Sequence, residues 1–258
     1  VREKCPLVHC ITNYVTVNDV ANAILAIGAS PIMADDINEA ADIASISSAL
    51  VINMGTLNQR TVASMLAAGK AANKKGIPVV FDPVGAGASA FRNETAKAVM
   101  KNVRVDILRG NLSEMSFMAG LEVSTKGVDS AAEDEKNDAV SVAKTVAEKF
   151  GCIAAITGAV DTISDGGRVI RISNGHSALS KVTGTGCMTS GIVGSFAGAS
   201  DDMLLAAAAG ICAMGIAGEI AYEKAGKIGT GSFHIAIIDA LSRLDGALAA
   251  ERIRADEK

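Results

Sequence analysis

Short apolar segments alternate with longer segments of mixed polar and apolar residues along most of this chain. The short segments, rich in Val and Ile, predict buried strands, whereas apolar residues recurring every three or four positions predict helices. Gly28 and Gly76 follow two of the helical patterns and predict their ends. The expected strands are 6–12, 31–34, 49–53, 78–82, 106–109 and 152–157, and the expected helices are 18–27, 39–48, 58–75, 93–102, 113–119 and 139–150.

The rest of the chain differs in pattern. Residues 161–164 and 168–172 predict a hairpin around a Gly-Gly pair, and helices are expected near 186–198, 202–225 and 232–247. Residues 120–137 are polar and predict an irregular surface loop. Alternating strands and helices predict a parallel sheet covered by helices. A closed eight-stranded barrel is the alternative, but consecutive closing helices favour an open, mostly parallel sheet in a three-layer α/β/α fold. We expect a single domain over residues 1–258.

Composition narrows the possible partners. Hydrophobic residues make up 49% of the 258 residues, the formal net charge is −4, and no basic block is present. Nucleic acid and anionic membranes are therefore poor candidates as partners. Residues 203–222 form the most apolar stretch, but it is mostly Ala and Gly and contains Glu219, which predicts a buried helix rather than a membrane span.

Cysteine usage predicts the compartment. None of the five cysteines forms a Cys-x-x-Cys pair, and four of them are expected to be small core residues: Cys5, Cys10, Cys152 and Cys212. Without a signal peptide, this pattern predicts a reduced, cytoplasmic protein. The chain starts at Val1 rather than at Met, so we expect that further residues precede it.

The segment 181–190 carries the strongest chemical signal. It joins a predicted strand end to a Gly- and Ala-rich helix, and no charged residue lies between Lys181 and Gly191. Unpaired backbone N–H groups and the helix dipole at such a turn favour a phosphate or a developing anion. Cys187 falls in the first helical turn, where a thiolate is favoured. The alternative is a tight turn with a small buried cysteine.

Polar or glycine residues follow most of the predicted strands. In an open parallel sheet, ligands bind beyond the carboxyl ends of the strands. These strand ends therefore predict a cleft that handles phosphate and metal. The residues are Thr12, Asn13, Met33, Asn53, Gly55, Asp82, Arg109, Asn111, Thr157 and Gly158.

Several of these side chains have two interpretations. Asp82 either holds a water or Mg²⁺, or caps the following turn. Glu114 either reaches Mg²⁺ through water or forms a capping box with Asn111. Arg109 ends a buried strand and needs an anion, which is either a fixed carboxylate or a nucleotide phosphate. His9, inside an apolar strand, is expected to be a hydrogen-bonded core histidine.

Short motifs in a fixed order connect the chain to a known family. They are Ile11–Asn13, Ala29–Ala34, Asn53–Leu57, Asp82–Ala88, Arg109–Asn111, Ile156–Gly158, Val182–Cys187 and Gly231–Phe233. Together they resemble the hydroxyethylthiazole kinase family of the ribokinase-like superfamily. The usual superfamily residue at position 187 is aspartate, and Cys187 is what resembles the thiazole kinase branch.

This resemblance implies an ATP- and Mg²⁺-dependent kinase of thiamin salvage. It would phosphorylate the primary hydroxyl of 4-methyl-5-(2-hydroxyethyl)thiazole. Residues Asn13, Met33 and Gly55 would line the thiazole pocket together with Gly184 and Cys187. Met33 is also compatible with a plain core position.

The resemblance also implies the catalytic and nucleotide sites. Arg109 and Thr157 would contact the ATP phosphates, and Asp82 and Glu114 would organise Mg²⁺ and its waters. The turn containing Gly184, Gly186 and Cys187 would be the catalytic anion hole for the transferred phosphoryl group. The family is trimeric, which implies a homotrimer with active sites between subunits.

Two other functions are compatible with parts of the sequence. A nucleotide-dependent lyase that repairs hydrated nicotinamide cofactors, of the NAD(P)HX dehydratase type, shares the Gly-x-Gly helix entry but would be expected to carry aspartate at position 187. A non-catalytic trimer could bind thiazole or nucleotide as a sensor. The acidic side chains of Asp82 and Glu114 argue against the sensor, because binding alone needs no residues that organise a metal.

Overall fold

The strands form one open sheet. The computed structural model describes residues 1–121 and 138–257, so nearly all of the predicted loop at 120–137 lies outside the described residues. The sheet has nine strands in the order β2-β1-β3-β4-β5-β6-β7-β8-β9. The strands are β1 (Leu7–Ile11), β2 (Ser30–Ile32), β3 (Ala49–Asn53), β4 (Val79–Asp82), β5 (Ile107–Asn111), β6 (Ile153–Thr157), β7 (Asp161–Ser164), β8 (Val169–Ile172) and β9 (Ala255–Glu257).

Pairing within the sheet changes at β6. The pairs from β2 to β6 are all parallel, whereas β6–β7, β7–β8 and β8–β9 are antiparallel. The carboxyl ends of the six parallel strands therefore lie along one edge. Because the sheet is open at β2 and β9, the barrel alternative is wrong and the predicted open, mostly parallel sheet is confirmed.

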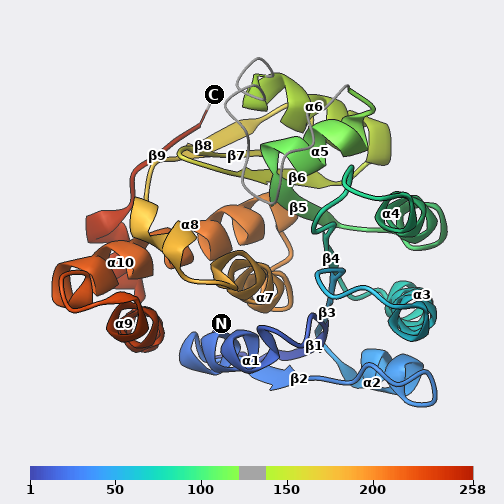
Figure 1. The fold of residues 1–258 in the computed structure, drawn as a ribbon, viewed down its shortest axis with the longest axis horizontal. Helices are drawn as coiled ribbons and strands as arrows, with labels where there is room; N and C mark the ends of the chain where they lie inside the picture. The colour runs from blue at the N-terminus through green and yellow to red at the C-terminus, as the bar shows by residue number, and fades with distance from the viewer. Residues whose placement is uncertain (122–137, 258) are drawn as a thin grey trace.

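Helices cover both faces of the sheet (Figure 1). The alternation of strand residues explains this, since Val51 faces one hydrophobic cluster while Leu50 and Ile52 face the other. The Val51 face is covered by α1 (Val17–Ala26), α7 (Thr185–Ala197), α8 (Met203–Ala225) and α9 (Thr230–Arg243). The opposite face is covered by α2 (Ala40–Ile46), α3 (Gln59–Lys75), α4 (Ala90–Asn102), α5 (Leu112–Ala119) and α6 (Ala139–Phe150).

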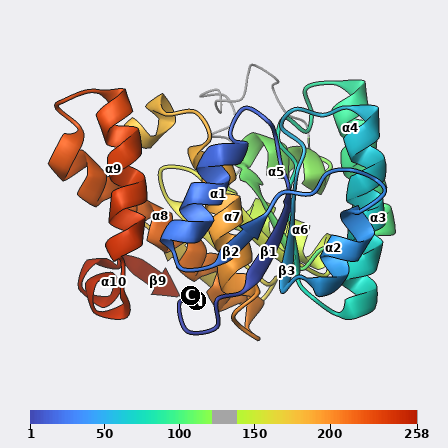
Figure 2. The same cartoon turned by 90° about the horizontal axis from the view of Figure 1, so that it is seen from below.

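The C-terminal segment contains two elements that the sequence did not predict. A short helix, α10 (Gly246–Arg252), follows the expected last helix, and β9 then joins the sheet edge beside β8. All three β9 residues are exposed, so no apolar alternation marks this strand. The ion pair between Arg254 and Glu219, 2.6 Å from Nη2 to Oε1, ties the segment to α8. Figure 2 shows β9 and α10 close together on the α8–α9 side.

Helix α8 is the one described helix that is long and apolar enough to cross a membrane. Its most apolar window is 72% buried inside the protein. It packs against α7, α9 and the β6–β8 part of the sheet. Length and composition alone are weak indications of a membrane span, and this burial confirms the predicted core helix.

Close approach of backbones shapes the α7 layer. A Cβ atom added to Gly194 of α7 would lie 2.4 Å from Cγ2 of Val51 in β3. A Cβ atom added to Gly210 of α8 would lie 2.7 Å from Cα of Val193 in α7. Both distances are shorter than van der Waals contact, so α7 packs this tightly against the sheet and α8 only because these positions are glycines.

Three of the four cysteine predictions are confirmed. Cys10, Cys152 and Cys212 are buried, but Cys5 is exposed, so its prediction as a core residue is wrong. Cys5 lies in a turn before β1, where its backbone N–H donates to the carbonyl of Val1 at 2.8 Å. His9 is confirmed as a buried, hydrogen-bonded histidine, with Nε2 2.7 Å from the carbonyl oxygen of Ala34.

Candidate active site

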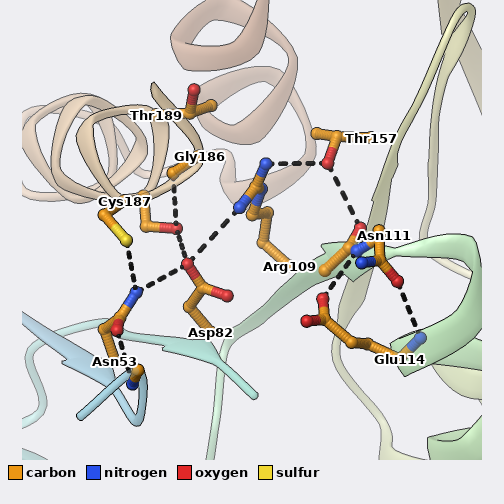
Figure 3. A network of polar contacts seen from close by, with 12 residues as sticks. Asn53, Asp82, Arg109, Asn111, Glu114, Thr157, Gly186, Cys187 and Thr189 are labelled. Carbon is orange, nitrogen blue, oxygen red and sulfur yellow. Dashed lines mark hydrogen bonds and ion pairs between the residues drawn. The ribbon is translucent and has the colours of Figure 1, made fainter. Parts of the chain in front are cut away.

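A connected network of polar side chains lies at the carboxyl edge of the parallel strands, facing the start of α7 (Figure 3). It runs from Cys187 through Asn53 to Asp82, and from there to Arg109 and Thr157. Asn53, Asp82 and Arg109 come from β3, β4 and β5, three neighbouring strands of the sheet. The topology thus brings together side chains that are far apart in the sequence.

Two asparagines hold the Cys187 end of the network. Nδ2 of Asn13 lies 3.0 Å from Sγ of Cys187, and Nδ2 of Asn53 lies 3.4 Å from it. The Oδ1 atom of Asn13 accepts hydrogen bonds from the backbone and hydroxyl of Thr16, at 3.2 and 3.0 Å. A Cβ atom on Gly55 would lie 2.8 Å from Nδ2 of Asn13, so a side chain at position 55 would displace this amide.

Asp82 is the centre of the network and is only 1% exposed. Its Oδ2 atom accepts hydrogen bonds from Ser190 at 2.7 Å and from Asn53 at 2.9 Å, and it lies 3.4 Å from Nη1 of Arg109. These partners are side chains from other elements, so the alternative of a cap on the following turn is wrong. Burial raises the pKa of Asp82, against the opposing effect of the Arg109 charge. Among the described residues, its Oδ1 atom has no hydrogen-bond partner.

Arg109 connects the carboxylate to the far end of the network. Its Nη2 donates to Oγ1 of Thr157 at 2.7 Å. A Cβ atom on Gly186 would lie 3.1 Å from Nη1, so the guanidinium lies directly against the first turn of α7. The predicted need for an anion is met by the fixed carboxylate of Asp82, and Nε is buried with no partner among the described residues.

Glu114 stands beside this network rather than inside it. Its Oε1 accepts from the backbone N–H of Gly85 at 2.7 Å, and its Oε2 accepts from that of Asn111 at 2.9 Å. Oδ1 of Asn111 in turn accepts from the backbone N–H of Glu114, which completes the capping box. Burial and then the nearby charge of Asp82 raise the pKa of Glu114 to about 7. The capping interpretation is confirmed, and a role with Mg²⁺ remains a prediction.

The start of α7 is open to an anion. Gly184 is its N-terminal cap, with φ of 88°, and within residues 1–121 and 138–257 no side chain caps this helix start. A Cβ atom on Gly184 would lie 2.5 Å from Cγ2 of Thr16. The backbone N–H of Met188 makes the first helical bond, to the carbonyl of Gly184 at 2.8 Å. The N–H groups before it have no carbonyl partner within the helix, an arrangement that binds phosphate.

The thiol of Cys187 is not activated as the sequence predicted. Burial raises its pKa, and the negative charge of Asp82 raises it further. The effect of the helix start is therefore outweighed, and the expectation of a favoured thiolate is wrong.

Met33 lies apart from the polar contacts. It follows β2 and packs, partly buried, against the hydrophobic cluster on the α7 side. No polar contact among the described residues joins it to the network. Its place in a thiazole pocket remains a prediction.

Some members of the site were missed or undervalued by the sequence prediction. Asn53 was noted as a strand end and as the first residue of the motif Asn53–Leu57 but was given no role in the site, yet it joins Cys187 to Asp82. Ser190 was not singled out, although it lies one helical turn after Gly186 and so shares its face of α7. That spacing is the signal that could have identified it.

The described structure also contains an apolar cavity of about 380 Å³, which lies elsewhere. Its lining includes Ile27 and Phe196, which lie at the C-terminal ends of α1 and α7. The network lies at the N-terminal end of α7, so this cavity is at the opposite end of the helix layer.

The arrangement suits the transfer of an anionic group. Three groups surround one place at the sheet edge: a helix start, a guanidinium and a buried carboxylate. Within the described residues, no side chain caps the helix start and one oxygen of the carboxylate has no hydrogen-bond partner. A phosphoryl group there would meet backbone N–H donors and a fixed positive charge.

Comparisons with known proteins agree with this geometry. The model of the hydroxyethylthiazole kinase family matches residues 1–247. The hydroxyethylthiazole kinase of Ruminiclostridium cellulolyticum is 64% identical over 258 residues, which are 100% of this chain and 94% of that protein. The solved hydroxyethylthiazole kinase structure from Pyrococcus horikoshii superposes with a TM-score of 0.90 at 39% identity, covering 100% of this chain and 95% of that one.

A more distant structure supports the fold alone. A ribokinase-like superfamily protein from Enterococcus faecalis superposes with a TM-score of 0.67 at 11% identity, covering 92% of this chain and 86% of that one. The fold is thus ribokinase-like, as predicted. The match of the family over nearly the whole chain, together with a 64% identical relative, places this chain in the hydroxyethylthiazole kinase family.

Proposed function

We propose that this protein is a hydroxyethylthiazole kinase that transfers the γ-phosphoryl group of ATP to the primary hydroxyl of 4-methyl-5-(2-hydroxyethyl)thiazole, in thiamin salvage. One observation carries the proposal. Cys187 lies in the first turn of α7, whose start has no side-chain cap among the residues that the structure describes. It is within hydrogen-bonding distance of Asn13 and lies beside the buried pair of Asp82 and Arg109. Membership of the kinase family supplies the substrate class.

The acceptor alcohol would bind at the Cys187 end of the network. Asn13 and Gly55 form the polar side of this place, and Met33 would supply an apolar surface for the flat thiazole ring. Because the pKa of Cys187 is raised, the thiol stays protonated at neutral pH and does not serve as the base. We assign it the role of shaping the approach of the hydroxyl group to the helix start.

The phosphates of ATP would bind at the Arg109 end. Phosphoryl transfer has a loose transition state, so positioning and neutralisation of charge provide most of the catalysis. Arg109 and Thr157 would hold the phosphates, while the turn containing Gly184 and Gly186 offers backbone N–H groups to the transferred group. The proton of the alcohol leaves late in such a reaction, so a strong base contributes little.

The residues present fit a requirement for Mg²⁺. Asp82 offers a buried carboxylate oxygen that lacks a partner among the described residues, and carboxylate oxygens are preferred Mg²⁺ ligands. Both oxygens of Glu114 accept from backbone N–H groups, so Glu114 would act on the waters of the ion rather than on the ion itself. When bound, Mg²⁺ would neutralise charge on the ATP phosphates.

Assembly, domain organisation and location complete the proposal. We propose a homotrimer with sites at subunit boundaries, supported by the family resemblance and by Tyr14 and Val15, which are 77% and 57% exposed beside Asn13. Helix α8 is largely buried within the subunit and adds no support for a trimer. One continuous sheet supports a single domain, and five unpaired cysteines support a cytoplasmic location.

The test is a substrate panel. The protein is incubated with ATP and Mg²⁺ and, separately, with the thiazole alcohol, hydroxymethylpyrimidine, pyridoxal or ribose, and phosphorylated products are quantified by mass spectrometry. We expect the thiazole alcohol to react much faster than the others. Equal or faster turnover of any other member would refute the substrate, and binding of the thiazole without any turnover would favour the sensor.

A further inference from the structure

Arg92 lies in the first turn of α4 and is bound to two loops of the active-site edge. Its Nη1 donates to the carbonyl oxygens of Met54 and Val84, both at 2.6 Å. Its Nη2 donates to the carbonyl oxygen of Gly55 at 2.7 Å. A Cβ atom on Gly85 would lie 3.1 Å from Cδ of Arg92, so the side chain packs closely between the loops. All three bonds are charge-assisted and short, which is the strong class.

The two loops are the ones that follow β3 and β4. Where the ladder between these strands ends, the backbone N–H of Met54 donates to the carbonyl of Asp82 at 3.3 Å. Beyond that point the strands diverge into separate loops, and Arg92 bridges them. In Figure 1 the two loops lie on the side of the sheet that is covered by α3 and α4.

Two of the carbonyl groups belong to peptide groups that are held at both ends. In the peptide between Met54 and Gly55, the oxygen accepts from Arg92 and the N–H donates to Oδ1 of Asn53 at 2.9 Å. A planar peptide cannot turn one end without the other. Arg92 therefore fixes the N–H group that orients the Asn53 amide, which itself contacts Cys187 and Asp82.

The second peptide group repeats this arrangement on the other loop. In the peptide between Val84 and Gly85, the oxygen accepts from Arg92 and the N–H donates to Oε1 of Glu114 at 2.7 Å. One guanidinium thus sets the orientation of two peptide groups, and each of these holds a different side chain of the site. Within the described residues, no ion pair involves Arg92, so carbonyl dipoles are its recorded partners.

We propose that Arg92 is a positioning residue for phosphoryl transfer. It acts through the Met54–Gly55 and Val84–Gly85 peptide groups to hold Asn53 and Glu114 in their productive orientations. This inference rests on the proposed function for its kinetic consequence, but its structural consequence is independent of any activity.

The test compares Arg92→Ala and Arg92→Lys with Arg104→Ala. Arg104 is a suitable control because its exposed side chain pairs with Asp106 before β5, at the end of the strand away from the site. We expect Arg92→Ala to lower kcat/KM for the thiazole alcohol roughly 10- to 100-fold, because small misplacements of catalytic groups have effects of that size. The KM for ATP should change little. Lysine should restore only part of the rate, since one ammonium does not reproduce the planar fork of donors.

Two further readouts separate positioning from general damage to the fold. Guanidinium ion at low, non-denaturing concentration should recover part of the activity of Arg92→Ala and should leave the activity of Arg104→Ala unchanged. Amide hydrogen exchange followed by mass spectrometry should speed up at the peptides containing Gly55 and Gly85 in Arg92→Ala alone. The exchange result decides the inference even if the parent protein proves not to phosphorylate the thiazole alcohol.

The inference is overturned by any of three results. The first is an Arg92→Ala protein with parental kcat/KM. The second is an Arg92→Ala protein in which the KM for ATP and the KM for the thiazole alcohol rise equally and guanidinium does not restore activity. The third is unchanged amide exchange at both loops.

Discussion

The pH dependence of stability should identify Glu114 as a buried, titrating group. Glu114 is only 6% exposed, and both of its carboxylate oxygens accept hydrogen bonds from backbone N–H groups. Burial, with the charge of Asp82, raises the pKa of Glu114 from 4.5 to about 7 in the folded protein. The folded state therefore binds a proton between these values that the unfolded state has lost. Stability falls with rising pH in this window, because the folded state holds more protons there.

The magnitude follows from the size of the shift. Each pKa unit corresponds to roughly 1.4 kcal/mol, so moving the pKa of Glu114 from 4.5 to about 7 corresponds to about 3 kcal/mol. This contribution is fully present below the unfolded pKa and is lost as the pH rises through the folded pKa. Glutamine at position 114 does not titrate, so the variant lacks this slope. It has a constant cost of about 1–3 kcal/mol instead, because its NH₂ group faces a backbone donor.

The assay is urea unfolding of the parent and Glu114→Gln proteins from about pH 5 to about pH 8. We expect the parent to be the more stable protein at the acidic end, and the difference to shrink by about 2–3 kcal/mol toward the alkaline end. Glu94→Gln, at an exposed position of α4, is the matched control and should keep the parental slope. A Glu114→Gln protein with the parental slope would refute the reasoning.

Four further predictions concern chemistry, metal, packing and assembly. Cys187→Ala should lose roughly 10- to 1,000-fold in rate, because the hydroxyl group of the alcohol would be less well positioned. Cys187→Asp should stay active in the same kinase assay, and complete loss in a folded Asp variant that still binds thiazole would mean that the thiol itself is required. Glu114→Gln should raise the Mg²⁺ concentration for half-maximal rate, and an unchanged dependence would leave Glu114 as a cap only. Gly210→Ala should lower the free energy of unfolding by about 1–3 kcal/mol in urea titrations, because its Cβ would lie 2.7 Å from Cα of Val193; parental stability would contradict this packing. Light scattering should give a trimer, and a fully active monomer would refute shared active sites.

Much of the fold was predictable because each local pattern agrees with the tertiary structure. The strand predicted at 49–53 is β3 itself, because its short apolar run has strand length, and in the structure all five residues are buried. The helix predicted at 139–150 matches α6, which Asp138 caps by accepting from two backbone N–H groups. In contrast, β9 has no apolar pattern, because it joins the sheet edge through backbone pairing and the Arg254–Glu219 ion pair.

The site was predictable only in part. The strand ends bring Asn13, Asp82, Arg109 and Thr157 to one edge, because parallel strands share a direction and this follows from the sequence pattern. The pKa of Cys187 was not predictable, because burial and the charge of Asp82 come from other elements and outweigh the local effect of the helix start.

The contacts of Arg92 lie further still from what the sequence indicates. Its three carbonyl partners belong to loops that are 8 to 38 positions away in the chain. Carbonyl groups occur in every residue type, so no residue identity marks them as partners.

The glycine contacts along α7 imply an unusual distribution of mutational tolerance. A helix that touches the sheet through bare backbone has no side-chain torsion with which to absorb an added methyl group. Any bulk introduced at Gly194, about two turns away from Cys187, must instead tilt or lift the whole helix and shift its N-terminal end, which faces the phosphate. Directed evolution toward new alcohols should consequently find few neutral steps in the middle of α7 and many at the loop tips, where movement stays local. The interior of this helix thus limits how far the enzyme can be remodelled.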